Sequence, residues 1–123
     1  MEVRYPPPLT VGGRIGVTAP SADVPEALRG RLEFCVEWLQ QRGYEVVVGE
    51  CMDGSGVTSA DAVERARELT AMLTDPAIGA VVPPWGGELA VEILPHIDFE
   101  AITRLPGRPG WSATRIYRRS CYR

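Results

Sequence analysis

Apolar residues follow two alternating spacings along this chain, and the alternation predicts the order of its elements. Short runs of consecutive apolar residues indicate buried strands, whereas apolar residues three and four positions apart indicate amphipathic helices. The expected strands are Arg14–Ala19, Glu45–Gly49 and Ile78–Val82. The expected helices lie between and after them, at about 23–43, 58–75, 88–94 and 99–104.

Polar residues and a glycine mark the expected helix ends. Asp23, with a proline and a glutamate close behind it, is expected to cap the first helix, and Gly43 to end it. Thr58 with Asp61 resembles a capping box before the second helix, and Asp98 can cap the last one. The stripe predicted to face the core in the first helix comprises Leu28, Leu32, Cys35, Val36 and Leu39.

The strands read as continuous apolar runs, which is typical of a parallel sheet buried on both faces by crossover helices. The predicted fold class is therefore α/β, a three-layer open parallel sheet of the Rossmann or flavodoxin-like kind that stops after about three strands. Ligands of such sheets bind beyond the carboxyl ends of the strands. Any site should thus be assembled from Pro20–Ser21, Gly49–Gly56 and Trp85–Gly87.

Size and composition indicate one globular domain. The chain has 123 residues, of which 45% are hydrophobic and 24% charged. No apolar run approaches the ~20 residues that span a bilayer, and the N-terminus lacks the pattern of a signal peptide. We therefore expect a cytoplasmic protein that does not associate with membranes.

The net charge of -3 conceals an uneven distribution. All 16 acidic residues lie at or before Glu100, whereas six of the 13 cationic residues follow Thr103. This break divides the chain into an α/β domain, residues 1–103, and a basic tail, residues 104–123, which we expect to be disordered or loosely packed. The tail has no helical or strand period and no basic motif, so no nucleic-acid partner is expected.

Neither a metal nor a nucleotide cofactor is expected. Cys35, Cys51 and Cys121 form no C-x-x-C pair, and His96 is not spaced with them as a zinc site requires. Cys35 is instead expected to be a small core residue on a helix face. The loop after the first strand lacks the glycines of a phosphate cradle, and Asp23 there would repel an anion.

The pair Gly86 and Gly87 is the most informative local feature. Glycines permit a close approach of backbone N–H groups to a bound oxygen, as an oxyanion hole or a carboxylate site requires. Trp85 beside them can form the wall of a pocket. The alternative is a plain turn from strand to helix with a packed indole, and the residues alone leave both interpretations open.

Two motifs resemble one enzyme family. Residues 14–21 read RIGVTAPS, which resembles the IGVVAPS opening of the LD-carboxypeptidase family of serine peptidases. Residues 75–102, with PWGGE followed by ILPHIDF, resemble a second motif of that family. Trp-Gly-Gly-Glu is closer to its branch of microcin-C self-immunity proteins than to the murein carboxypeptidases. The resemblance runs from about Tyr5 to Ile102.

The resemblance implies a serine hydrolase that cleaves an amide next to a free carboxylate in a peptide-like small molecule, and homodimers for full-length members. In the family, a glycine pair beside the nucleophile helps to hold the oxyanion, and Gly86 and Gly87 match it. With Trp85 and Ser21 they form the predicted substrate- and oxyanion-binding set. The family's catalytic glutamate and histidine come from a later domain and have no match here, and His96 is not that histidine. We therefore expect an N-terminal domain without peptidase turnover.

The tail departs from the family where a fourth strand and a Gly-Tyr-Ser-Asp nucleophile turn should follow. If Pro109–Arg123 is encoded with suitable synonymous codons, reading from the third nucleotide gives Gly-Leu-Val-Gly-Tyr-Ser-Asp. We interpret the tail as the product of a frameshift near Pro106–Pro109. Ser112 superficially resembles the nucleophile, but the residues before it are poor strand material, so no complete catalytic set is predicted.

Two alternatives remain. The chain can be a non-catalytic module that uses Trp85, Gly86, Gly87 and Ser21 to hold a small carboxylate. It can also be an unstable pseudogene product, because loss of a fourth strand leaves an open sheet edge beside Val82.

Overall fold

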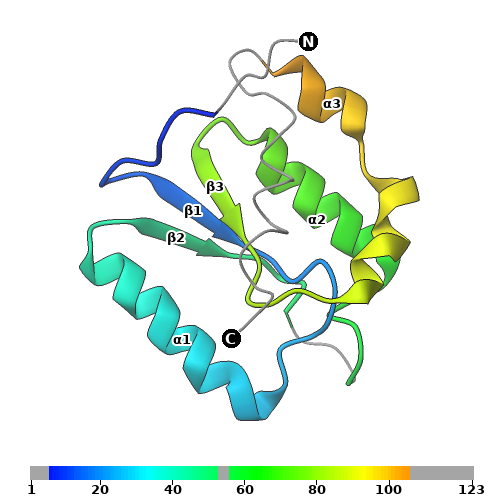
Figure 1. The fold of residues 1–123 in the computed structure, drawn as a ribbon, viewed down its shortest axis with the longest axis horizontal. Helices are drawn as coiled ribbons and strands as arrows, with labels where there is room; N and C mark the ends of the chain where they lie inside the picture. The colour runs from blue at the N-terminus through cyan, green and yellow to red at the C-terminus, as the bar shows by residue number, and fades with distance from the viewer. Residues whose placement is uncertain (1–5, 53–55, 106–123) are drawn as a thin grey trace.

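Three parallel strands lie at the centre of the fold (Figure 1). The computed structural model describes residues 6–52 and 56–105. The strands are β1 (Arg14–Val17), β2 (Glu45–Val48) and β3 (Ile78–Val82), in the order β2-β1-β3. The helices are α1 (Glu26–Gln41), α2 (Ala62–Thr74), the 3-10 helix η1 (Glu88–His96) and α3 (Phe99–Arg104).

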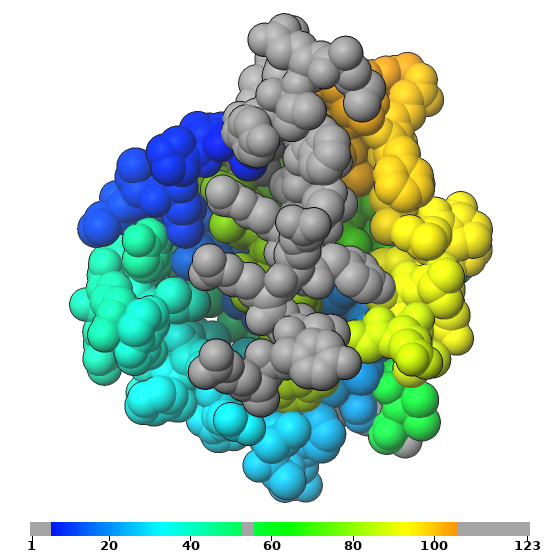
Figure 2. All heavy atoms as spheres, in the orientation of Figure 1, coloured from blue at the N-terminus to red at the C-terminus, as the bar shows by residue number. Residues whose placement is uncertain are grey.

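The arrangement confirms the predicted fold class. Helix α1 lies on one side of the sheet, whereas α2, η1 and α3 lie on the other (Figure 1). In the face seen in Figure 2, α1 and η1 accordingly occupy opposite sides of the molecule. Strand β1 is central because Ile15 pairs in register with Val46 of β2 and with Ala80 of β3. Because both pairings are parallel, the carboxyl ends of all three strands lie at the same edge of the sheet.

The main hydrophobic core lies on the α2 side of the sheet. Gly16 of β1 allows α2 to approach closely, because a Cβ there would lie 2.9 Å from Sδ of Met72 and 3.4 Å from Cδ1 of Ile78. The buried cluster comprises Ala66, Leu69, Met72, Leu73, Ile78, Val81, Ile93 and Ile102. The helices after β2 and β3 therefore share one apolar interior.

The α1 side is less closed than the apolar patterns predict. No residue of α1 is buried, and its predicted inner stripe is only half-buried. Cys35 is exposed, so its predicted place in the core is wrong: the helix turns that position toward solvent. Val47 and Val48 are also exposed, at 37% and 43%, because β2 is an edge strand of the described sheet and α1 covers it incompletely. The expectation of burial on both faces thus holds for β1 but fails for β2.

The start of α1 also differs from the prediction. The helix begins at Glu26 after Pro25, and no side chain caps it. Asp23 is buried instead, and its backbone N–H donates to the carbonyl oxygen of Val57 at 3.4 Å. Asp23 therefore ties the loop after β1 to the chain before α2. Gly43 ends α1 as predicted, with a φ of 85°.

The other two predicted caps lie close to the observed ones. Asp61, rather than Thr58, caps α2, and its Oδ1 accepts a hydrogen bond from the Glu64 amide at 2.9 Å. Asp98 caps α3 as predicted, accepting from the Ala101 amide at 2.8 Å. Among residues 6–52 and 56–105, no helix has the length and apolar character needed to cross a membrane.

Because the α2 side of the sheet is more tightly packed than the α1 side, truncating a leucine should destabilise the protein more on the α2 side. Leu73 of α2 is 1% exposed within the core, so Leu73→Ala should lower the free energy of unfolding by about 2–5 kcal/mol. Leu32 of α1 is half-buried, so Leu32→Ala should cost clearly less. Urea unfolding of both variants measures the difference, and equal losses would contradict the uneven packing.

Candidate functional site

The loops after β1 and β2 are joined at the carboxyl edge of the sheet. The Ala19 amide donates to the Cys51 carbonyl at 3.3 Å, and the Val24 amide donates to the Met52 carbonyl at 2.7 Å. These backbone bonds connect segments that are about thirty residues apart in sequence. The two loops therefore form one surface beyond the strands, as the strand-end rule predicts.

The loop after β3 joins this surface through Trp85 and Gly87. The indole Nε1 of Trp85 donates to the Asp23 carbonyl at 3.2 Å. Gly87 lies so close to Ser21 that a Cβ on Gly87 would collide with the Ser21 hydroxyl. The structure thus brings Ser21, Trp85 and Gly87 together. Gly86 lies between the last two and is exposed.

Ser21 has an unusual environment. It is 1% exposed, and its Oγ has no hydrogen-bond partner within the described residues. A buried hydroxyl without a partner costs about 1–3 kcal/mol, so most such groups are bonded in folded proteins. A hydroxyl offers one donor and two acceptor positions. The buried hydroxyl oxygen lies against Gly87, at the point where the loops after β1 and β3 meet.

Arg65 also belongs to this region, although the sequence analysis did not select it. This residue of α2 is 1% exposed. Its Nε donates to the Ala60 carbonyl at 2.9 Å, and its Nη1 donates to the carbonyls of Pro20 at 2.9 Å and Leu89 at 3.3 Å. Nη2 forms an ion pair with Glu92 at 2.7 Å. The sequence did contain a signal for it: Arg65 lies three residues after Ala62, so it falls on the apolar face of the predicted helix, where a charged residue is unexpected.

Glu68, one turn further along α2, was missed as well. Its carboxylate accepts hydrogen bonds from the Thr18 hydroxyl and from the backbone amides of Glu50 and Cys51. Gly49 is needed at the end of β2 because a Cβ there would collide with this carboxylate. Burial, followed by the charge and hydrogen bonding of Glu68, raises the pKa of the Cys51 thiol to about 11. Cys51 therefore stays protonated at neutral pH and is not a nucleophile.

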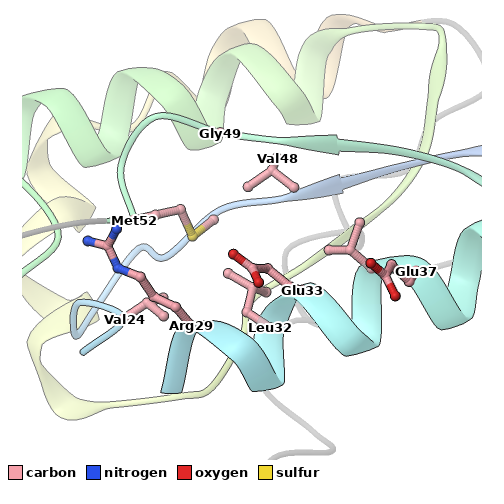
Figure 3. Close-up of a pocket in the computed structure, with 9 residues that line it drawn as sticks. Val24, Arg29, Leu32, Glu33, Glu37, Val48, Gly49 and Met52 are labelled. Carbon is pink, nitrogen blue, oxygen red and sulfur yellow. The ribbon is translucent and has the colours of Figure 1, made fainter. Parts of the chain in front are cut away.

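A cavity of about 400 Å³ lies between α1 and the end of β2 (Figure 3). Glu33 and Glu37 reach it from α1, and Met52 from the loop after β2. The residues that line it are Val24, Arg29, Leu32, Glu33, Val36, Glu37, Val48, Gly49 and Met52. Gly49 and Met52 belong to a segment predicted to form the site, but Ser21, Trp85, Gly86 and Gly87 do not line this cavity, which reflects the incomplete packing of α1.

The remaining candidate residues are Ser112 and His96. Ser112 lies outside the described residues. His96 is exposed at the end of η1. In the part of the chain that the structure describes, no three His, Cys, Asp or Glu side chains gather as a metal site requires.

Comparison with known proteins identifies the family. A family model described as the LD-carboxypeptidase N-terminal domain matches residues 15–112. A Vibrio cholerae protein that carries the name of a carboxypeptidase is 30% identical over 103 residues, which cover 83% of this chain and 31% of that protein. The Microcin C7 self-immunity protein MccF of Escherichia coli is 30% identical over 100 residues, covering 80% of this chain and 29% of MccF.

Solved structures agree with the sequence relatives. Wild-type MccF in its apo state superposes with a TM-score of 0.76 at 30% identity, covering 82% of this chain and 30% of that one. MccF has also been solved with glutamyl sulfamoyl guanosine and with aspartyl sulfamoyl adenosine. A muramoyltetrapeptide carboxypeptidase of Oxalobacter formigenes gives 0.58 at 25% identity, covering 73% of this chain and 29% of that one.

The described chain spans about 30% of the length of these relatives. The match covers most of the chain and includes residues 15–21 of the first motif and all of the second motif, residues 75–102. The chain therefore belongs to the LD-carboxypeptidase family of serine peptidases and corresponds to its N-terminal domain.

Proposed function

We propose that this chain is the N-terminal domain of a serine carboxypeptidase of the LD-carboxypeptidase and microcin-immunity type, and that it forms part of the substrate site without turnover of its own. Ser21, Gly86 and Gly87 hold a carbonyl or carboxylate oxygen of the substrate, and Trp85 forms the wall beside it. One observation carries the proposal: the buried Ser21 hydroxyl has no partner in the part of the chain that the structure describes, and it lies against Gly87, which is exposed.

The proposed chemistry follows from the charge that amide hydrolysis generates. Negative charge develops on the carbonyl oxygen in the transition state, and fixed donors at that oxygen stabilise it. The Ser21 hydroxyl can supply such a donor. The glycine pair lets a ligand approach the backbone, because neither residue has a side chain to prevent it. Trp85 is held in place by its bond to the Asp23 carbonyl.

The proposed ligand class is a peptide-like small molecule with a free carboxylate. The relatives support this class, because MccF has been solved with glutamyl sulfamoyl guanosine and aspartyl sulfamoyl adenosine, and another relative is a muramoyltetrapeptide carboxypeptidase. No nucleic acid or cofactor is part of the proposal. We further propose a cytoplasmic location, a compartment in which free thiols such as those of Cys35 and Cys51 stay reduced.

The proposed lack of turnover rests on the surroundings of the buried serines. A serine nucleophile needs a base within hydrogen-bond reach. Among residues 6–52 and 56–105 the Ser21 hydroxyl has no hydrogen-bond partner, and the Ser59 hydroxyl donates to the Ala19 carbonyl at 2.6 Å. Neither described serine is therefore activated. Ser21 suits a role in binding, and the catalytic groups of the family are proposed to come from sequence that this chain does not match.

Ligand binding tests the site directly. A dipeptide with a free C-terminal carboxylate should raise the melting temperature of the protein, whereas the same dipeptide with a C-terminal amide should not. Ser21→Ala should weaken binding about tenfold or more, because a hydrogen bond to a charged group contributes about 1.5–3 kcal/mol.

Thr70→Val provides the matched control for this experiment. Thr70 of α2 also has a buried hydroxyl oxygen without a partner, and the strand-end loops do not include it. Its variant should bind like the unmodified protein. Equal stabilisation by the acid and the amide, or equal binding by Ser21→Ala, would contradict the proposed site.

Activity assays test the second half of the proposal. The purified chain should release no product from an LD-peptide or a peptidyl-nucleotide, even at high protein concentration. Hydrolysis that Ser112→Ala abolishes would show that this chain assembles a nucleophile of its own. Such a result would overturn the proposed inactivity while leaving the family assignment intact.

The basic segment 104–123 completes the proposal. We propose that a frameshift near Pro106–Pro109 replaced the nucleophile strand of the family; the match to the family model ends nearby, at residue 112. Sequencing the gene should reveal a downstream frame that begins with Gly-Tyr-Ser-Asp. Unrelated DNA at that place would refute the frameshift.

A second interpretation is supported by the edge of the sheet. β3 is an edge strand of the described sheet, and its Val82 is 45% exposed. An open strand edge with an exposed valine favours association with other chains. If the protein is insoluble on expression, it is better described as an unstable product. If it is soluble and binds the carboxylate without turnover, it is a binding module.

A further inference from the structure

We propose that Arg65 is the positioning residue of the Ser21 and Gly87 pair. Its guanidinium fixes the loop after β1 against the beginning of η1, and these are the two segments from which the pair comes. The positioning is a property of the fold itself. Its consequence for ligands rests on the proposed function, and the two are tested separately below.

One nitrogen of Arg65 bridges the two segments. Nη1 donates to the Pro20 carbonyl at 2.9 Å and to the Leu89 carbonyl at 3.3 Å. Pro20 directly precedes Ser21, and Leu89 is the second residue after Gly87. Because both carbonyls share one donor atom, the separation of the two segments is set at the point where Ser21 and Gly87 make contact.

The remaining donors fix the guanidinium in its plane. Nε donates to the Ala60 carbonyl at 2.9 Å, and Nη2 pairs with Glu92 at 2.7 Å. A planar group that is bonded on three sides cannot rotate without breaking those bonds. The Arg65 side chain is 2% exposed, whereas that of Glu92 is 48% exposed. Three backbone carbonyls and one half-exposed carboxylate are therefore the partners of the buried Arg65 guanidinium.

Arg65 also lies apart from the residues that stabilise the fold as a whole. The hydrophobic core uses Ala66, Leu69 and Leu73 of α2, with Ala62 packed against it. Arg65 is in the first turn of α2, and its partners lie in the loops after β1 and before α2 and in η1. Its replacement should therefore disturb the loops more than the core, whereas a core truncation such as Leu69→Ala should do the reverse.

The first experiment compares Arg65→Met, Arg65→Lys and Leu69→Ala. Amide resonances of Ser21, Gly86 and Gly87 should shift strongly in Arg65→Met, and their hydrogen exchange should accelerate at least tenfold. Leu69→Ala should leave these resonances in place even where it lowers the melting temperature as much. Arg65→Lys keeps the charge but lacks the planar fork, so it should restore these signals only in part.

Two results would overturn the proposal. One is that the three amides respond no more to Arg65→Met than to Leu69→Ala. The other applies if Arg65→Met does not fold: a folded Arg65→Lys protein with unchanged Ser21 and Gly87 resonances would show that the guanidinium fork does not set the contact.

The second experiment measures binding of the free-carboxylate dipeptide. If the unmodified protein binds it, Arg65→Lys should weaken binding severalfold while Leu69→Ala leaves it unchanged, and equal binding by both would contradict the consequence for ligands. If the unmodified protein does not bind it, the proposed function fails. The amide resonances still decide whether Arg65 positions the pair, so the two failures are distinguishable.

Discussion

A guanidinium buried at the carboxyl edge of the sheet is the interaction on which this region depends. A charge removed from water must be compensated by good partners, and the cost of leaving it unpaired is several kcal/mol. Arg65 finds one carboxylate, on Glu92, and three backbone carbonyls. Those carbonyls belong to the segments that follow β1, precede α2 and follow β3. Arg65 of α2 therefore links loops that also bond directly to one another.

Glu68 complements Arg65 one turn later on the same helix. Arg65 donates to carbonyls, whereas the Glu68 carboxylate accepts from the Thr18 hydroxyl and from backbone amides of the loop after β2. The polar ends of three strands thus obtain both donors and acceptors from one helix. Further along α2, the apolar residues close the core beneath β3. On the opposite side no residue of α1 is buried, and the cavity beside this helix is consistent with its looser packing.

Local signals account for the parts that the sequence predicts well. β3 begins and ends where its apolar run does, and Asp98 caps α3 because the cap depends on residues only three positions apart. Asp23 does not cap α1, because that helix begins only at Glu26, after Pro25. Arg65 was missed because its bond to Pro20 spans 45 residues, and no local pattern reports such a contact. Cys35 shows a further limit, since a helical stripe indicates a direction but not what covers it.

The candidate site combines a predictable location with an unpredictable detail. The rule for open parallel sheets, together with the two motifs, selects Ser21 and Gly87 without any coordinates. The sequence cannot show that the Ser21 hydroxyl is buried without a partner among the described residues, because that depends on how closely the loops after β1 and β3 approach each other. An unpaired buried hydroxyl opposes folding, and a neighbouring carbonyl could have satisfied it, as the Ala19 carbonyl satisfies Ser59. A ligand oxygen that completes the Ser21 hydrogen bond would offset this cost on binding, which links a buried hydroxyl without a partner in the described residues to the function proposed for it.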